Sequence, residues 1–407
     1  MSERKIDVYN HVMPRAVADR IRELAAGKGD MVKRVTSIPM LYDIEGRVRM
    51  MDQWPGYQQV LTLSSPPIET IAGPGDAPDL AHVANEELKK ICEARPDKFP
   101  AWVASLPLND VSASLEEMDR AIALGARGIQ IFTNVAGRPL DDPEFLPIFR
   151  HATNHHKIPI WMHPARDARV ADYPGEAKSK YEIWQVLGWP YETSVAMARL
   201  VFSGILDRLP EMRIITHHLG AMIPYFEGRV GPLWDQLGTR TSDEDYSGIL
   251  AAMKARGRRP IDYFRLFYND TAVGGSASAI RCGLDFFGAD RVLFATDCPF
   301  DPEGGPMFIR ETIAALNGLV LADEERARHL LRQRVAHAED GVQIGRRRPA
   351  SITPPKAAIT GRDYTVIGIT GKVPVSGTSK VFLPTRSHAL CPVVSSRLPN
   401  GDGACTK

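Results

Sequence analysis

The chain has 407 residues, of which 44% are hydrophobic and 24% charged, the composition of an ordinary folded globular protein. Its formal net charge of +1 lacks the basic excess that nucleic-acid-binding proteins carry. No apolar run reaches the length of a membrane span, and the first residues lack the apolar stretch of a signal peptide. Five cysteines without a Cys-x-x-Cys pair argue against a disulfide framework or a thiolate metal site. We therefore expect a cytoplasmic protein that binds neither nucleic acid nor membrane.

Eight short apolar runs follow one another along the chain, as expected for buried parallel strands. Helical patterns separate several of them, for example at residues 115–124, 143–154 and 194–209. A strand followed by a helix, repeated eight times, predicts an α/β fold, the (β/α)8 TIM barrel. The runs are centred near Val8, Val60, Val103, Ile129, Ile160, Ile215, Tyr268 and Phe294.

Three stretches do not fit a minimal barrel. Residues 14–57 have too few apolar repeats for one helix and are interpreted as an insertion after the first strand. Residues 164–190, rich in charge, Tyr and Trp, predict a lid-like loop after the fifth strand. From Arg346 the composition turns to Pro, Thr, Ser, Gly and Lys, which is typical of a disordered tail. The expected organisation is a barrel over residues 1–345 and a low-complexity tail over residues 346–407.

Four polar residues end predicted strands: His11, His163, His218 and Asp297 follow strands one, five, six and eight. Taken singly, each histidine fits a strand-end side chain bonded to a backbone carbonyl, and Asp297 fits an N-cap. Together they would meet at the C-terminal face of the barrel, where such enzymes keep their chemistry. Histidines and a carboxylate at that face predict a site for one divalent metal, zinc first and manganese second.

Neighbouring residues raise further expectations. Strand alternation places Tyr9 on the same side as His11. His217 and His218 are adjacent, so we expect only His218 to point inward, on the face of Thr216, while His217 packs or supports. Three other histidines gather at a helix end, where positive charge suits the helix dipole: His151, His155 and His156.

At these residues the chain resembles the amidohydrolase superfamily, and within it the branch of aminocarboxymuconate semialdehyde decarboxylase and the non-oxidative aromatic-acid decarboxylases. The resemblance covers about residues 5 to 320. It implies a metal-dependent carboxy-lyase on a barrel, often a homodimer, that acts on a small aromatic or unsaturated carboxylic acid. The strings that carry it are residues 47–52, 132–145, 188–193, 218–224 and 296–300.

The resemblance also implies roles for single residues. His11, His163 and Asp297 match metal ligands, and His218 matches a histidine that acts as general base or orients the reactive water. Arg229 matches an arginine that reaches into the neighbouring subunit and binds a substrate carboxylate. Further substrate contacts are expected from Trp184, close to a substrate-contacting tryptophan of the family, and from Arg166. In the decarboxylation hypothesis Asp297 or His218 handles the proton.

Three departures from the family pattern stand out. Tyr9 replaces a His or Glu ligand, so we expect its hydroxyl to bind substrate or a metal-bound water. Ala221 replaces a Glu of the resorcylate-type enzymes, so the chain leans away from them. Residues 330–337 occupy the place of the family's final helix. Two alternatives therefore stay open: hydrolysis of a C–C, lactone or amide bond at the same site, and an inactive barrel that serves as a binding protein.

Overall fold

The computed structural model describes residues 4–25, 30–240 and 244–319. Each of the eight predicted runs forms strand in it, with Val103 and Phe294 directly beside the strand residues. The strands are β1 (Lys5–Val12), β2 (Tyr57–Leu63), β3 (Ala101–Trp102), β4 (Ala104–Ser105), β5 (Ile129–Phe132), β8 (Ile160–His163), β9 (Ile214–Thr216), β10 (Tyr268–Asp270) and β11 (Val292–Leu293).

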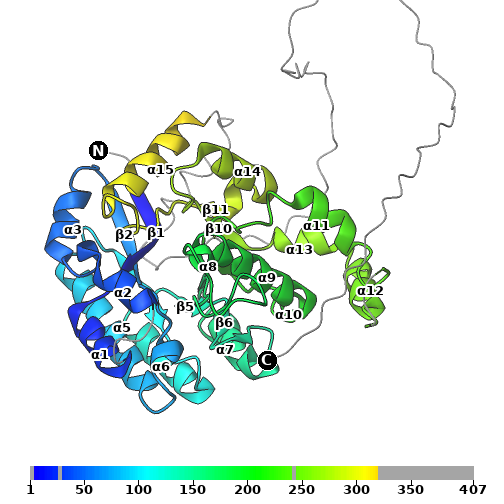
Figure 1. Cartoon of the computed structure of the whole chain (residues 1–407), viewed down its shortest axis with the longest axis horizontal. Helices are drawn as coiled ribbons and strands as arrows, with labels where there is room; N and C mark the ends of the chain where they lie inside the picture. Colours follow the sequence, from blue (N-terminus) through cyan, green and yellow to red (C-terminus); the bar gives the residue numbers. More distant parts are fainter. Residues whose placement is uncertain (1–3, 26–29, 241–243, 320–407) are drawn as a thin grey trace, which may run out of the picture. The chain divides into compact units, whose positions relative to one another are not determined.

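The strands form a closed parallel barrel (Figure 1). Two parallel sheets have the orders β1-β2-β3 and β11-β10-β9-β8-β5-β4. Val103, between β3 and β4, joins them on one side, because its amide donates to the Leu61 carbonyl at 2.9 Å. On the other side the Val8 amide donates to the Phe294 carbonyl at 3.0 Å. The predicted (β/α)8 fold is thus confirmed, and all strand C-termini share one face.

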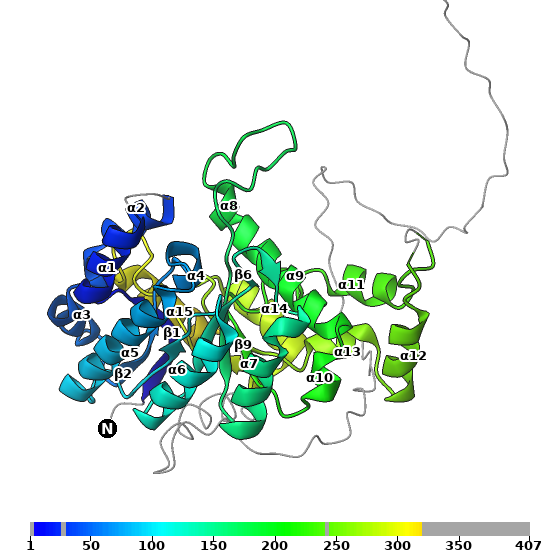
Figure 2. The ribbon, with the colours of Figure 1, turned by 90° about the horizontal axis from the view of Figure 1, so that it is seen from below.

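Helices surround the barrel (Figures 1 and 2). The expected helix at residues 115–124 is α6 (Val111–Ala123), and that at 143–154 is η2 (Pro143–Phe145), α7 (Leu146–Arg150) and the π-helical turn η3 (His151–His155). The expected helix at 194–209 begins earlier and breaks at Gly204, whose φ of 72° no helix accepts, giving α9 (Gly188–Phe202) and α10 (Ile205–Arg208). The others are α4 (Ile68–Ile71), α5 (Ala77–Ala94), α8 (Ile183–Val186), α11 (Glu227–Trp234), α12 (Ser247–Ala255), α13 (Pro260–Phe264), α14 (Ala277–Phe287) and α15 (Pro306–Gly318).

The insertion after the first strand consists of short helices rather than one: α1 (Arg15–Ala25), α2 (Asp30–Thr36), η1 (Pro39–Leu41) and α3 (Ile44–Met51). The apolar side chains of α1, α2 and η1 form a second cluster with α5, whereas those of α3 belong to the main core. From α3 the fully buried Arg47 donates to the His11 carbonyl at 2.6 Å, to Gln59 Oε1 at 2.7 Å and to Asn10 Oδ1 at 2.9 Å. The insertion therefore holds the end of β1 that carries His11.

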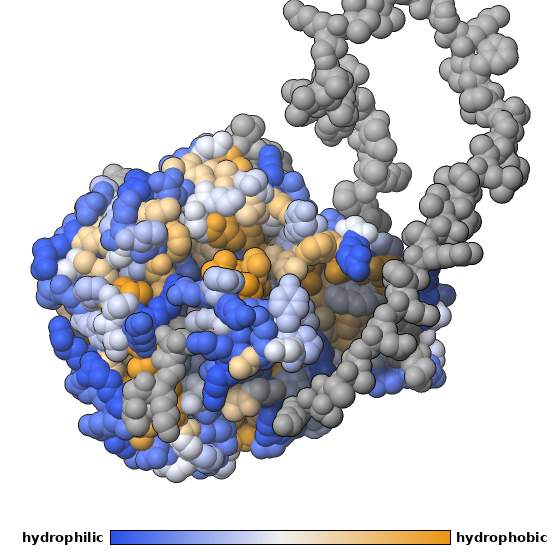
Figure 3. Space-filling view, in the orientation of Figure 1, coloured by the Kyte–Doolittle hydropathy of each residue, from blue (hydrophilic) through white to orange (hydrophobic). Residues whose placement is uncertain are grey.

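The segment after β8 projects from the molecule beside α8 (Figure 2). Most of it lacks helix or strand until α8 begins at Ile183. Several large apolar side chains are exposed there and on the helices that follow: Val170, Tyr173, Tyr181, Val186, Leu187, Tyr191, Val195, Tyr225 and Leu233. Elsewhere, in the view of Figure 3, apolar residues gather near the middle of the face shown, inside a hydrophilic rim.

Several expectations fall on parts of the chain that the structure does not describe. The tail at residues 346–407, the segment 330–337, Cys391 and Cys405 lie outside the described residues. The described cysteines, Cys92, Cys282 and Cys298, are free thiols. Among the described helices, none combines the length and the apolar character needed to cross a bilayer.

Candidate metal centre

The structure brings the four predicted strand-end residues together. His11 and His163 are buried near the ends of β1 and β8, and His218 follows β9. Asp297 lies past β11, held by its amide's hydrogen bond to the Tyr9 carbonyl at 3.2 Å. Asp297 Oδ1 is 3.3 Å from His11 Nε2, and Asp297 Oδ2 is 3.6 Å from His218 Nε2. The Asp297 carboxylate thus lies close to histidines that are at least 79 positions away from it in the sequence.

A fifth residue, His217, belongs to the same cluster, so the expectation that only His218 points inward is wrong. His217 Nε2 is 3.3 Å from Asp297 Oδ1, and its side chain is fully buried. Ile215, two residues before His217, packs with Tyr9 and Trp161 inside the barrel, so strand alternation directs His217 inward and the expectation chose the wrong face. After β9 ends at Thr216, a left-handed turn with φ of 61° at His218 and 56° at Leu219 brings His218 to the site as well. Both adjacent imidazoles can therefore reach Asp297.

Three of these histidines share one hydrogen-bonding pattern. The Nδ1 atom of His11 is 3.1 Å from Thr62 Oγ1, that of His163 is 2.7 Å from the Pro164 carbonyl, and that of His217 is 2.5 Å from Asp270 Oδ2. Each ring thus keeps Nε2 for another partner, and the buried Nε2 atoms of His11 and His217 have no hydrogen bond among the described residues.

This pattern fits a divalent metal. Ligand atoms of His11, His163 and His217 all lie within 4.8 Å of one another, as do those of His217, His218 and Asp297. A second partner on Nδ1 that fixes the ring is what metal-binding histidines usually have. The buried, unpartnered Nε2 atoms would otherwise be costly, so the donor set suits a metal ion.

Burial and mutual contact perturb the titration of these groups. Burial, reinforced by the neighbouring His11 and His217, holds the pKa of His163 well below its usual value. Burial also lowers the pKa of His11, against the opposing effect of Asp297. Burial disfavours the carboxylate of Asp297, but the close contacts with His11, His217 and His218 outweigh it and hold that pKa well below its usual value. The site therefore offers a charged carboxylate beside the neutral imidazoles of His11 and His163. Burial lowers the pKa of His217, but the charges of Asp270 and Asp297 outweigh burial and raise that pKa to about 10, so a metal would have to displace a proton from His217.

Tyr9 lies inside the cluster, on the side of His11 as expected. Its ring packs against His217 with centroids 4.1 Å apart, and against His11 at 5.6 Å. The side chain is fully buried, and its hydroxyl has no hydrogen-bond partner among the described residues. Burial, together with the charges of Asp270 and Asp297, raises the pKa of this phenol well above 10. The hydroxyl is therefore a neutral group that still lacks a partner.

Aromatic side chains line the cluster. Trp189 packs edge-on against His163, with ring centroids 5.3 Å apart, and Trp184 packs in turn against Trp189 at 5.7 Å. Phe132 lies 5.5 Å from His163, and Phe300 lies 5.5 Å from His11. The predicted Trp184 is thus one ring removed from the histidines, and Trp189 is the tryptophan in contact with them.

The two predicted arginines are placed differently. Arg166 NH1 pairs with Glu192 Oε1 at 2.7 Å, so its charge is already compensated. Arg229 is exposed on α11, and within the described part of the chain no side chain pairs with it.

A third arginine, Arg34 of α2, was not predicted. Its guanidinium lies 5.4 Å above the ring of Phe300, which itself contacts His11. Its buried Nε has no hydrogen-bond partner in the described residues, and its NH1 is 3.8 Å from Glu182 Oε2. Arg34 lies in the insertion, where no sequence pattern connects it to the strand ends.

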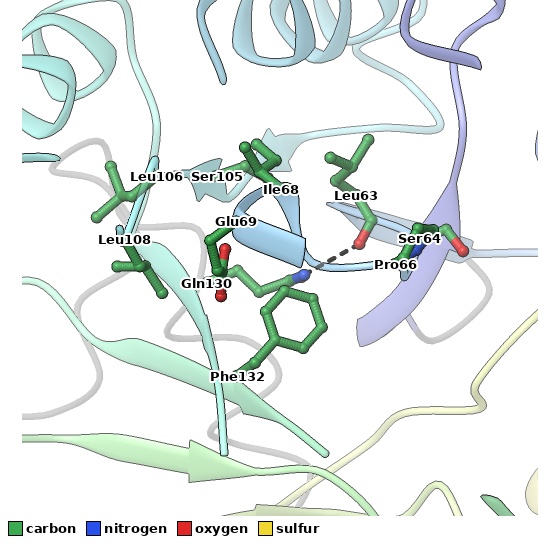
Figure 4. Close-up of a pocket in the computed structure, with 10 residues that line it drawn as sticks. All are labelled: Leu63, Ser64, Pro66, Ile68, Glu69, Ser105, Leu106, Leu108, Gln130 and Phe132. Carbon is green, nitrogen blue, oxygen red and sulfur yellow. Dashed lines mark hydrogen bonds between the residues drawn. The ribbon is translucent and has the colours of Figure 1, made fainter. Parts of the chain in front are cut away.

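A small pocket lies beside the cluster, at the ends of β2, β4 and β5 (Figure 4). Gln130 crosses it to donate to the Leu63 carbonyl at 3.0 Å, and Phe132 separates it from His163. Both carboxyl oxygens of Glu69, Ser105 Oγ and Gln130 Oε1 are buried there without a hydrogen-bond partner in the described residues. Burial raises the pKa of Glu69 to about 8. The pocket thus offers a neutral carboxyl group and unused acceptors.

Comparison with known proteins places this site in a family. A family model described as amidohydrolase matches residues 6–331. The chain belongs to this amidohydrolase family. It is 31% identical over 277 residues to gamma-resorcylate decarboxylase from Rhizobium sp. (strain MTP-10005), a match that covers 64% of this chain and 78% of the relative. It is 28% identical over 230 residues to 2-amino-3-carboxymuconate-6-semialdehyde decarboxylase from Dictyostelium discoideum, covering 56% and 59%. Ala221 therefore does not separate the chain from resorcylate-type relatives in overall similarity.

Solved structures show the same fold. A 2,6-dihydroxybenzoate decarboxylase in complex with 2,6-dihydroxybenzoate superposes with a TM-score of 0.61 at 25% identity, over 80% of this chain and 96% of that one. A 5-carboxyvanillate decarboxylase from Novosphingobium aromaticivorans, in complex with manganese and 4-hydroxy-3-methoxy-5-nitrobenzoic acid, gives a TM-score of 0.66 at 23% identity, over 81% and 93%. The relatives are thus carboxy-lyases of aromatic or unsaturated acids, and solved members hold manganese.

Proposed function

We propose that this chain is a metal-dependent, non-oxidative decarboxylase of a small aromatic or unsaturated carboxylic acid. The observation that carries the proposal is the set of three buried histidines whose Nδ1 atoms are engaged elsewhere and whose Nε2 atoms are left for a ligand beside Asp297. The decarboxylases among the relatives support the reaction type.

The proposed ligands are the predicted His11, His163 and Asp297, joined by His217. His217 follows β9 and packs directly on Tyr9, the residue that replaces a family ligand. It thus brings an imidazole to a site that has lost its first ligand on β1. Three imidazole nitrogens and one carboxylate suit zinc, while the solved relative favours manganese.

A divalent metal bound there supplies a Lewis acid that polarises a substrate oxygen. For decarboxylation, the carbon that bears the carboxylate must first become tetrahedral. His218, whose side chain keeps 20% of its surface exposed, would deliver a proton to that carbon, or Asp297, 3.6 Å away, would do so. The C–C bond then breaks, its electron pair returns to the ring, and the carboxylate leaves as CO2, so charge is conserved.

The chain's other residues would bind the acid and keep water out. Arg34 is the best-placed cation of the same chain for the substrate carboxylate, because it stands over Phe300 with unused donor capacity. Trp184, Trp189 and Phe132 form apolar walls against the ring. The neutral Glu69 and Gln130 would accept or donate to a ring hydroxyl from the adjoining pocket. The Tyr9 hydroxyl, which lacks a partner among the described residues, would bind the substrate.

Arg229 and Arg166 would complete the clamp in a homodimer. Arg229 is exposed on α11, near exposed apolar residues such as Tyr225 and Leu233 on or beside the same helix, which supports a partner subunit there. Glu192 compensates the charge of Arg166, so Arg166 would orient the acid rather than form an ion pair with its carboxylate. A cytoplasmic location completes the proposal and agrees with the free thiols of the described residues.

Two measurements test the proposal together. Metal analysis of protein purified without chelator should find a divalent ion that His163→Ala and Asp297→Ala lose, whereas His82→Ala, a change at an exposed histidine, keeps it. When metal-loaded protein is assayed against a panel of hydroxylated benzoates, it should release CO2 from at least one of them. Opening of a ring, lactone or amide without release of CO2 would show that the protein is a hydrolase instead. Full metal retention in both site variants would refute the ligand set.

A further inference from the structure

A second histidine cluster lies away from the metal centre, on the outer helices. It consists of Asp119 on α6 together with His151, His155 and His156 at the π-helical turn η3, and we call it the outer cluster. η3 precedes β8, whereas His163 ends that strand, so the two sites lie towards opposite ends of the barrel. α6 and α7 pack side by side (Figures 1 and 2).

The π turn is what brings these imidazoles together. The His156 amide donates to the His151 carbonyl at 3.1 Å, a bond that spans five residues instead of four. The wider turn places residues 151, 155 and 156 on one side: the rings of His151 and His155 stack with centroids 4.6 Å apart, and that of His156 lies 4.6 Å from His155. An ordinary helical turn would point His156 away from His151.

Two of the imidazoles meet at one carboxylate oxygen. His151 Nε2 and His156 Nε2 both lie 2.6 Å from Asp119 Oδ1. Ligand atoms of all four residues lie within 4.8 Å of one another, although the histidines and Asp119 come from different elements. The side chains of His151 and His156 are only 23% and 14% exposed, so they are not free surface rotamers.

We propose that the outer cluster binds a transition-metal ion of the zinc, nickel or copper class. Each of the three histidines can offer a ring nitrogen and Asp119 a carboxylate oxygen, and these four atoms share one small volume. Three nitrogens and one carboxylate oxygen are a complete tetrahedral donor set for zinc. Ligands of such an ion lie roughly 3.4 Å apart, which the observed atoms reach by small side-chain rotations.

Such an ion would tie α6 to the turn after α7. It would link the helix that follows β4 with the helix that follows β5, which otherwise meet through packing and the Asp119 contacts. The site is therefore structural: it adds stability in proportion to metal occupancy and takes no part in the reaction at the other end of the barrel.

Zinc binding of the full chain tests this directly. In equilibrium dialysis with metal quantification, the wild type should hold about two zinc ions per chain, and His151→Ala/His155→Ala about one. His82→Ala, a matched change at another exposed histidine, should hold as many as the wild type. Unchanged zinc content in His151→Ala/His155→Ala, or binding only at millimolar zinc, would overturn the outer site.

A thermal readout separates this site from the metal centre. In the His163→Ala background, zinc should still raise the melting temperature, and adding His151→Ala/His155→Ala should abolish that rise. If the proposed metal centre is wrong, His163→Ala will not lower the zinc content, but His151→Ala/His155→Ala will still remove an ion. Absence of any zinc-dependent rise in His163→Ala would count against the outer site alone.

Discussion

Asp270 holds His217 in a fixed orientation, with Oδ2 2.5 Å from Nδ1 while Oδ1 accepts from the amides of His218 and Ala272 at 3.0 Å. A single carboxylate at the end of β10 thus orients one histidine and the backbone of the next. Burial opposes protonation of His217, but the charges of Asp270 and Asp297 prevail and raise its pKa. Carboxylate–histidine pairs of this kind support metal ligands in many proteins.

Asp270→Asn should therefore weaken metal binding. We expect a loss of affinity of about 10- to 100-fold, because the amide supports the ring less well than the carboxylate does. Competition with a chelator of known affinity measures this. Asp285→Asn, at an exposed position of α14, serves as the control and should match the wild type. Equal metal affinity in Asp270→Asn would show that His217 is not a ligand.

Tyr9→Phe should keep the metal and impair turnover. The phenol is buried, neutral and without a partner, so its removal should also stabilise the metal-free protein by about 1 kcal/mol. Metal content, thermal unfolding and kcat are the three measurements. If the metal is lost with the hydroxyl, then Tyr9 is a ligand itself and His217 does not replace it.

Arg34→Met should raise KM for the carboxylic acid. Loss of a charged hydrogen bond to the substrate should lower kcat/KM by roughly tenfold to a hundredfold, with little change in melting temperature. Lys33→Met, at the exposed neighbouring position, is the matched control and should behave as the wild type. Normal kinetics in Arg34→Met would leave the carboxylate to Arg229 or Arg166.

Arg229 should act in the neighbouring subunit. His163→Ala and Arg229→Ala should each be inactive, yet subunits mixed by co-expression should regain about a quarter of wild-type activity. Half of the dimers are then mixed, and each holds one site with both its own metal ligands and the partner's arginine. Inactivity of the mixture, with mixed dimers demonstrated by tags, would place Arg229 outside the site.

Glu69 should make the stability of the fold depend on pH. Its pKa rises on folding from 4.5 to about 8, so the native state binds a proton more tightly than the unfolded chain. The contribution of Glu69 to the free energy of unfolding is therefore fully present below about pH 4.5 and is lost as the pH rises towards 8. Glu69→Gln should remove this loss, so its advantage over the wild type should grow by up to about 1.4 kcal/mol per pH unit between those limits. Denaturant unfolding at pH 5 and at pH 8 measures it; a constant difference would show that Glu69 is already ionised at pH 5.

Much of this architecture is readable in the sequence because it depends on local patterns. Buried parallel strands are apolar throughout, so the eight runs and the polar residues that end them, such as His163 and Asp297, stand out. Strand alternation correctly placed Tyr9 beside His11. For His217 the alternation also holds, but the prediction took Thr216 instead of Ile215 as the inward residue, and His218 reaches the site only through the left-handed turn that begins at His218.

The residues that were missed depend on contacts far apart in the chain. Arg34 reaches the site through Phe300, and Glu69 is buried by β4 and β5, which follow it in the sequence. Neither has a spacing that distinguishes it from an ordinary surface residue. The break at Gly204 likewise needs a φ value that a glycine permits but does not require. Tertiary packing decides these features.

The hydrogen bond from Arg47 to the His11 carbonyl has a consequence for how this protein can be re-engineered. Loop exchange between barrels usually treats the segments after the strands as replaceable parts. Here a graft that swapped residues 14–57 for a short connection would delete the buried cation on which Gln59, Asn10 and the His11 carbonyl all depend. The acceptors left behind would be buried and unpartnered, and the His11 carbonyl would lose the hydrogen bond that holds it. A chimaera must therefore transfer this segment together with the strand ends that carry the site, or leave both unchanged.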